Sequence, residues 1–145
     1  MKATIVYQSQ RGKTAGYARE MAMYLWQKGM NVSLCATSDF KAEKLEHCDC
    51  LILGCWTSGW FIVNQHPNKI WTDFAEKYLQ GKLPPHLILF TTYKFHTGSM
   101  FNRMKKKLNL EGIEKIETLK SKTGFLSTED KSKLDKFIGN INNLK

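Results

Sequence analysis

Residues 3–14 read ATIVYQSQRGKT, an apolar run that passes directly into a short polar loop. The run predicts a buried strand, and the residues that follow the loop have the periodicity of an amphipathic helix. A helix N-terminus presents free N–H groups and the positive end of the helix dipole, which favour an anion. Ser9 and Thr14 add hydroxyl donors, and Arg11 and Lys13 add positive charge. This stretch therefore predicts a phosphate-binding turn between strand and helix.

The same alternation of strand and helix continues along the whole chain. Strands are expected over 4–7, 31–36, 50–54, 86–91 and 113–119, and helices over 14–28, 40–46, 67–80, 99–108 and 127–142. Pro67 suits a first helical turn, and Ser127 with Asp130 suits a capping box. Strands that alternate with helices predict an α/β fold, a doubly wound parallel sheet with helices on both faces. The 145 residues fit one domain, 1–145.

Composition narrows the class of protein further. No apolar run approaches the roughly 20 residues that a membrane helix needs. Residues 1–6 enter a strand too early for a signal peptide, so a cytoplasmic location is expected. Cys48 and Cys50 are separated by one residue, whereas redox and zinc pairs usually have two residues between them. Buried free thiols are therefore favoured over a metal or redox site, and no metal ligands are assigned.

Two further loops follow predicted strands. Residues 55–61 read CWTSGWF, and residues 91–99 read TTYKFHTGS. Aromatic side chains around a glycine either pack as a satellite core or stack on a flat ligand. Because the carboxyl ends of neighbouring parallel strands meet at one edge of a sheet, the three loops are expected to form a single site.

These loops resemble the motifs of the flavodoxin family in its short form, and the resemblance spans nearly the whole chain. Residues 9–14, SQRGKT, are similar to the family's phosphate motif, with Arg11 where threonine is more usual. Residues 53–60, LGCWTSGW, are similar to its second loop, with Trp60 where an acid is common and Ser58 where a stacking aromatic is common. Residues 92–95, TYKF, resemble its third loop.

The resemblance implies a three-layer, five-stranded parallel sheet with strand order 2-1-3-4-5. It also implies FMN as the cofactor and transfer of one or two electrons to or from a redox partner protein, with no catalytic side chain. The peptide after Gly59 is expected to change orientation on reduction. The implied FMN-binding residues are Ser9, Gln10, Arg11, Gly12, Lys13, Thr14, Trp56, Thr57, Ser58, Gly59, Trp60, Thr92, Tyr93, Phe95 and Gly98.

Charge separates this chain from the acidic members of that family. The formal net charge is +9, and Arg11, Lys13, Lys94 and His96 lie on the ligand loops without any acid. A basic face favours a partner with an acidic docking surface, or an anionic co-substrate, and a less negative potential than acidic relatives have. The run 105–107 is interpreted as the solvated end of a helix rather than a nucleic-acid patch.

Two other functions stay open. A small FMN-dependent oxidoreductase, of the NAD(P)H, quinone or protoporphyrinogen-oxidase-like type, would turn over its own substrate. A non-catalytic binding module would use the basic surface without flavin. A P-loop nucleotide hydrolase is excluded, because its motif requires glycine at position 7, where Tyr7 stands.

Overall fold

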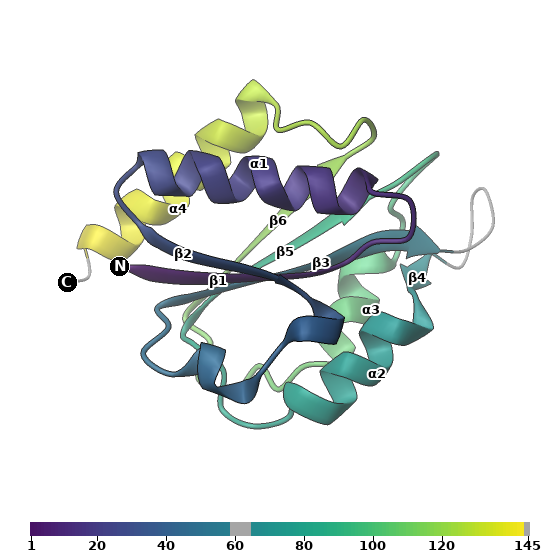
Figure 1. The fold of residues 1–145 in the computed structure, drawn as a ribbon, viewed down its shortest axis with the longest axis horizontal. Helices are drawn as coiled ribbons and strands as arrows, with labels where there is room; N and C mark the ends of the chain where they lie inside the picture. The colour runs from purple at the N-terminus through teal and green to yellow at the C-terminus, as the bar shows by residue number, and fades with distance from the viewer. Residues whose placement is uncertain (59–64, 144–145) are drawn as a thin grey trace.

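The computed structural model describes residues 1–58 and 65–143, in which a central sheet lies between two layers of helices (Figure 1). The sheet order is β2-β1-β3-β5-β6, all parallel, with β4 paired antiparallel to β3. In the sequence-based count of five strands this order is 2-1-3-4-5, so the predicted fold is confirmed. The strands are β1 (Lys2–Gln8), β2 (Asn31–Ala36), β3 (Cys50–Ser58), β4 (His66–Pro67), β5 (His86–Thr92) and β6 (Lys115–Ser121). The helices are α1 (Lys13–Gln27), α2 (Lys69–Tyr78), α3 (Met100–Lys106) and α4 (Thr128–Asn143), with 3-10 turns at Thr37–Asp39 and Ala42–Leu45.

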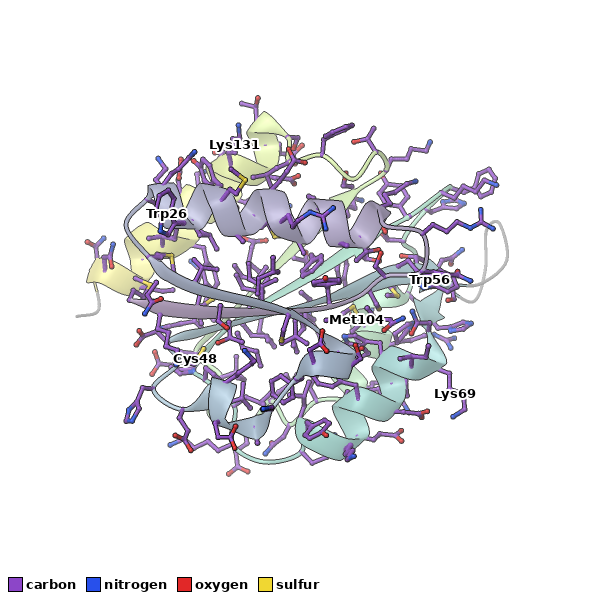
Figure 2. All side chains as sticks on the ribbon, viewed as in Figure 1. Trp26, Cys48, Trp56, Lys69, Met104 and Lys131 are labelled. Carbon is purple, nitrogen blue, oxygen red and sulfur yellow. The ribbon has the colours of Figure 1, made fainter. Side chains whose placement is uncertain are left out.

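Helices α1 and α4 cover one face of the sheet, and α2 and α3 cover the other (Figure 1). Figure 2 shows Lys131 of α4 and Met104 of α3 on opposite sides of the sheet. Each face has its own core, because strands buried on both sides are apolar at consecutive positions. Under α1 and α4 the core contains Ile52 and Phe90, and under α2 and α3 it contains Leu53.

Most element boundaries differ from the sequence prediction by a residue or two, but of the helix expected over 40–46 only a 3-10 turn at Ala42–Leu45 forms. Two short 3-10 turns flank Phe40, and neither has a side-chain N-cap hydrogen bond. Phe40 itself has an extended backbone, and its buried ring packs edge-on against Phe74 at 5.1 Å between centroids. Burying this ring takes precedence over continuing a helix through it.

The predicted start of the next helix at Pro67 is also wrong. Pro67 lies in β4, opposite Thr57 of β3, where an edge strand tolerates the missing N–H. Helix α2 instead begins at Lys69, after Asn68, whose Oδ1 accepts a 2.9 Å hydrogen bond from the Trp71 N–H. The same pairing lengthens β3, so residues 55–58 belong to the strand and not to the expected loop.

Two smaller predictions are confirmed. The Asp130 N–H donates to Ser127 Oγ (3.0 Å), and the Ser127 N–H donates to Asp130 Oδ2 (3.1 Å), which completes the capping box of α4. Cys35, Cys48, Cys50 and Cys55 are all buried, free thiols. Within residues 1–58 and 65–143, no helix is long and apolar enough to cross a membrane.

Candidate ligand-binding site

The first loop is held in shape by the side chain of Ser9. Its Oγ accepts hydrogen bonds from the N–H groups of Gly12 (3.1 Å) and Ala15 (3.3 Å). Gly12 has φ +90°, a left-handed conformation that suits glycine, and it is the N-cap residue directly before α1. The N–H groups of Lys13 and Thr14 lack intrahelical acceptors because they belong to the first turn. These two N–H groups, at the positive end of the helix, can bind an anion, and residues 9–14 are called the anion-binding turn below.

Two pairs of threonines connect the strand ends. Thr14 Oγ1 lies 2.6 Å from Thr92 Oγ1, which joins the first loop to the end of β5. Thr91 Oγ1 donates to the carbonyl of Cys55 (2.7 Å) and lies 2.7 Å from Thr57 Oγ1. Thr91 Oγ1 also lies 3.2 Å from the Thr92 carbonyl, and because carbonyl oxygens only accept, the single hydroxyl proton of Thr91 is donated to a carbonyl and Thr57 is the donor to Thr91. Thr57 therefore presents only lone pairs to a ligand, whereas the Thr14–Thr92 pair retains one hydroxyl proton to donate.

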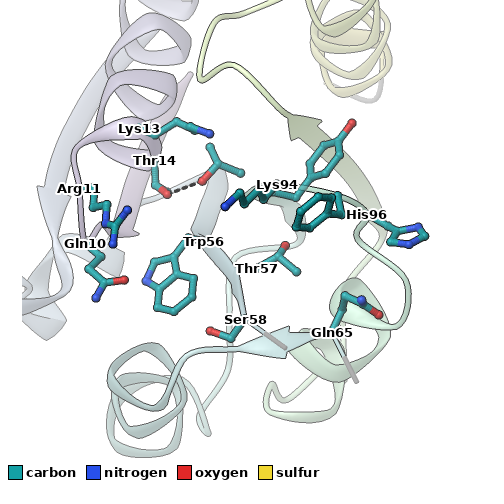
Figure 3. Close-up of a pocket in the computed structure, with 13 residues that line it drawn as sticks. Gln10, Arg11, Lys13, Thr14, Trp56, Thr57, Ser58, Gln65, Lys94 and His96 are labelled. Carbon is teal, nitrogen blue, oxygen red and sulfur yellow. Dashed lines mark hydrogen bonds between the residues drawn. The ribbon is translucent and has the colours of Figure 1, made fainter. Parts of the chain in front are cut away.

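These groups lie around one pocket of about 430 Å³ at the carboxyl ends of β1, β3 and β5 (Figure 3). That volume lies within the range of small-molecule sites, roughly 300–1,000 Å³. Residues 93–99, between β5 and α3, are called the β5 loop. Figure 3 shows Trp56 on one side of the pocket and Lys94 of the β5 loop on the other. The pocket is lined by Gln10, Arg11, Lys13, Thr14, Trp56, Thr57, Ser58, Gln65, Thr92, Tyr93, Lys94, Phe95 and His96.

The lining of the pocket is positively charged. Arg11, Lys13 and Lys94 contribute cations, and the lining contains neither aspartate nor glutamate. Within the described residues none of these three cations forms an ion pair. Lys13 Nζ instead donates to the carbonyl of Lys122 (2.9 Å), and Lys94 Nζ lies 5.6 Å from the centroid of the Phe95 ring. An anionic ligand would meet uncompensated positive charge here.

The structure brings most of the sequence-predicted site residues together. Ten line the pocket: Gln10, Arg11, Lys13, Thr14, Trp56, Thr57, Ser58, Thr92, Tyr93 and Phe95. Ser9, Gly12 and Gly98 do not line the pocket. Ser9 and Gly12 instead stabilise the first loop through the hydrogen bond from the Gly12 N–H to Ser9 Oγ. Gly59 and Trp60, with the peptide change expected after Gly59, lie outside the described residues.

Three lining residues were not among the predicted site residues. The sequence marks Lys94 and His96 only as basic residues on a loop. Gln65 is only 4% exposed and its carbonyl accepts from Ser99 Oγ (2.9 Å). No sequence motif identifies Gln65 as a site residue. Gln65 directly precedes β4 and lies at the pocket because β4 pairs with β3. Gly98, with φ +47°, lies so close to the Gln65 side chain that a Cβ would collide with it, so Gly98 leaves room for Gln65.

Three of the cysteines, Cys35, Cys50 and Cys55, are poor sources of a reactive thiolate. Burial raises the pKa of the Cys50 and Cys55 thiols, and it also raises the pKa of Cys35. A thiol with a raised pKa stays protonated at neutral pH and is a poor nucleophile. The chemistry of the pocket therefore rests on anion binding, hydroxyl groups and aromatic surfaces.

Comparison with known proteins places this geometry in context. The chain is 26% identical over 114 residues to a flavodoxin of Clostridium beijerinckii, covering 79% of this chain and 80% of the relative. Among solved structures, a flavodoxin of Streptococcus pneumoniae TIGR4 superposes with a TM-score of 0.74 at 20% identity, covering 100% of both chains. The two-electron reduced flavodoxin of Megasphaera elsdenii superposes with a TM-score of 0.71 at 22% identity, covering 94% of this chain and 98% of that one. No family model matches the chain.

Proposed function

Because this chain is a flavodoxin-family protein, related in sequence to a clostridial flavodoxin and alike in fold to others, we propose that it binds FMN and transfers electrons to and from a redox partner. The observation that carries the proposal is the convergence of three strand-end loops on one pocket. One loop offers an anion-binding helix N-terminus, and the other two offer hydroxyl groups and aromatic rings. These are the groups that a phosphorylated, flat, partly apolar cofactor requires.

The residues present suit FMN in detail. The N–H groups of Lys13 and Thr14, with the spare proton of the Thr14–Thr92 pair, would hold the phosphate. Trp56 and the aromatic residues of the β5 loop would pack against the flavin ring. Thr57, which presents only lone pairs, would accept a hydrogen bond from an N–H or O–H of the cofactor. The flavin would supply the redox chemistry, while the protein binds, orients and tunes it.

The charge of the pocket also suggests the kind of partner. Arg11, Lys13 and Lys94 line the pocket, and no acidic residue joins them in the lining. Such a surface attracts a negatively charged docking face and speeds the encounter at low ionic strength. We therefore propose that the redox partner has an acidic docking surface and not a basic one.

Absorption spectroscopy tests the cofactor assignment. The purified chain is incubated with excess FMN, desalted and scanned in the visible range, and a parallel sample receives riboflavin. Retention of FMN with flavin absorption bands, and weaker retention of riboflavin, are expected because riboflavin lacks the phosphate. A colourless protein that also leaves FMN fluorescence unquenched would contradict the proposal and favour a basic binding module.

A second function is favoured by the same uncompensated charge. An anionic co-substrate such as NADPH would be attracted to a pocket lined by three cations that form no ion pair within the described residues. The chain would then be a small FMN-dependent oxidoreductase with its own substrate. Steady consumption of NADPH by the FMN-loaded protein without any partner identifies an oxidoreductase, and its absence with retained FMN identifies a carrier.

A further inference from the structure

The pocket contains more positive charge than the phosphate of FMN can balance. A phosphate monoester has a charge of roughly −1.5 to −2 near neutral pH. Three cations line the pocket, and none is paired with a carboxylate within the described residues. About one positive charge is therefore left over once the phosphate is bound.

The position of Lys94 identifies the leftover charge. Arg11 and Lys13 belong to the anion-binding turn, and Lys13 is tied to the Lys122 carbonyl beside it. Lys94 instead lies on the β5 loop, and Figure 3 shows its side chain extending into the pocket. Its Nζ is 5.6 Å from the centroid of the Phe95 ring, within the range of a cation–π contact. Lys94 is thus the cation that is associated with the aromatic part of the pocket.

We propose that Lys94 selectively stabilises the reduced form of the bound flavin, an inference that rests on the proposed binding of FMN. Reduction by an external two-electron donor such as dithionite, with uptake of one proton, would leave one more negative charge in the pocket. An ammonium group near the ring lowers the energy of that charge and has little effect on the neutral oxidised ring. The site therefore binds reduced FMN more tightly than a site without this cation would.

Coulomb's law gives the size of the effect. A unit charge about 7 Å away, at an effective dielectric constant near 40, changes the ratio of the two affinities about five- to tenfold. By thermodynamic linkage, a tenfold change in this ratio shifts a two-electron potential by about 30 mV. Removing the cation is expected to make the potential more negative by about that amount.

The experiment compares three proteins: the wild-type chain, Lys94→Gln and Lys77→Gln. Lys77 is a matched control, because its Nζ also lies over a ring, 5.1 Å from the centroid of Tyr78, and it does not line the pocket. Dissociation constants are measured for FMN and riboflavin, each oxidised and dithionite-reduced, together with the midpoint potential. Lys94→Gln is expected to lose five- to tenfold more affinity for the reduced than for the oxidised form of both flavins. Lys77→Gln is expected to change this ratio less than twofold, and Lys94→Arg to restore it.

Two outcomes would overturn the proposal. If Lys94→Gln weakens oxidised FMN but leaves riboflavin unchanged, Lys94 binds the phosphate and not the ring. If the ratio and the potential stay at wild-type values while circular dichroism shows a folded protein, the cation has no influence on reduction. Neither outcome is the same as failure of the wild-type chain to bind FMN, which would contradict the proposed function itself.

Discussion

The hydroxyl of Tyr17 on α1 donates a 2.9 Å hydrogen bond to Asp130 Oδ2 on α4, although the two residues are 113 positions apart. Tyr17 is fully buried, and its ring meets Phe90 of β5 edge-on at 5.8 Å between centroids. The same carboxylate oxygen accepts the N–H of Ser127 in the capping box. One buried carboxylate thus caps α4 and connects it to the helix that forms the anion-binding turn.

Tyr17→Phe is expected to reduce the free energy of unfolding by about 1–3 kcal/mol, because it removes a donor from the buried Asp130. Tyr24→Phe is the matched control. Tyr24 also donates from α1 to an aspartate of α4, at 2.7 Å to Asp135 Oδ1, but this bond is exposed. Its loss is expected to cost less than about 1 kcal/mol. Urea denaturation of both variants measures the difference, and equal losses would show that burial does not determine the strength of the connection.

Gly54→Ala is expected to destabilise the protein by about 1–3 kcal/mol through overpacking. Gly54 lies in β3, and a Cβ there would collide with the ring of Phe90 on β5. Gly139→Ala, in α4, has nothing within 4 Å of the added Cβ, and is expected to stabilise by about 0.5–1 kcal/mol. Thermal denaturation of the two variants should shift in opposite directions. An unchanged transition for Gly54→Ala would mean that the Phe90 ring moves aside without cost.

Trp56→Ala is expected to weaken FMN binding about 2- to 13-fold, because an aromatic pair contributes about 0.5–1.5 kcal/mol beyond its buried area. Trp26→Ala serves as the control, since Trp26 is 69% exposed on α1 and Figure 2 shows it at the far end of the molecule from Trp56. Fluorescence titration with FMN gives both constants. An unaffected Trp56 variant would show that Trp56 is not part of the stacking surface and, among the described lining residues, would leave Tyr93 and Phe95 as the aromatic candidates.

Alkaline pH is expected to unfold the protein through its buried thiols. Burial raises the pKa of Cys50 and Cys55 above the usual value of 9.0. A raised folded-state pKa means that the folded protein holds these protons more tightly, so stability is intact below pH 9 and falls as the pH rises further. Each thiol contributes a slope approaching about 1.4 kcal/mol per pH unit.

Cys55→Ala should reduce the slope of unfolding free energy against pH between pH 9 and 10 by the contribution of one thiol, up to about 1.4 kcal/mol per pH unit. Urea denaturation of wild type and variant at pH 7, 9, 9.5 and 10 separates this slope from the loss of packing, which appears equally at pH 7. If the two stability profiles run parallel throughout, Cys55 does not contribute to alkaline unfolding.

Much of the fold is predictable from sequence because its signals are local. Runs such as residues 50–54 are apolar at every position, as strands buried on both faces require, and Ser127 with Asp130 marks a helix start within four residues. The errors arise where distant contacts compete with local preference. Pro67 is favourable in a first helical turn, yet it pairs with Thr57, and Phe40 interrupts a helical segment to reach Phe74.

The site likewise contains residues that are predictable from local sequence and residues whose positions depend on distant contacts. Residues on the three strand-end loops line the pocket because the carboxyl ends of neighbouring parallel strands lie at the same edge of the sheet. Gln65 follows no such loop, and only the pairing of β4 with β3 carries it there. Lys94 is visible in sequence as a charge, but its place among aromatic rings depends on the conformation of the β5 loop.

The pairing of Thr57 with Pro67 and of Ser58 with His66 has a consequence for evolution and engineering. The β3–β4 pairing holds Ser58 and His66 opposite each other, so extra residues inserted between the two strands would add mainly the entropy of closing a longer connection. Doubling the length of a flexible loop adds only about 0.6 kcal/mol of closure entropy. The β3–β4 pairing is therefore a place where new recognition elements can be added beside the pocket while the parallel sheet stays the same.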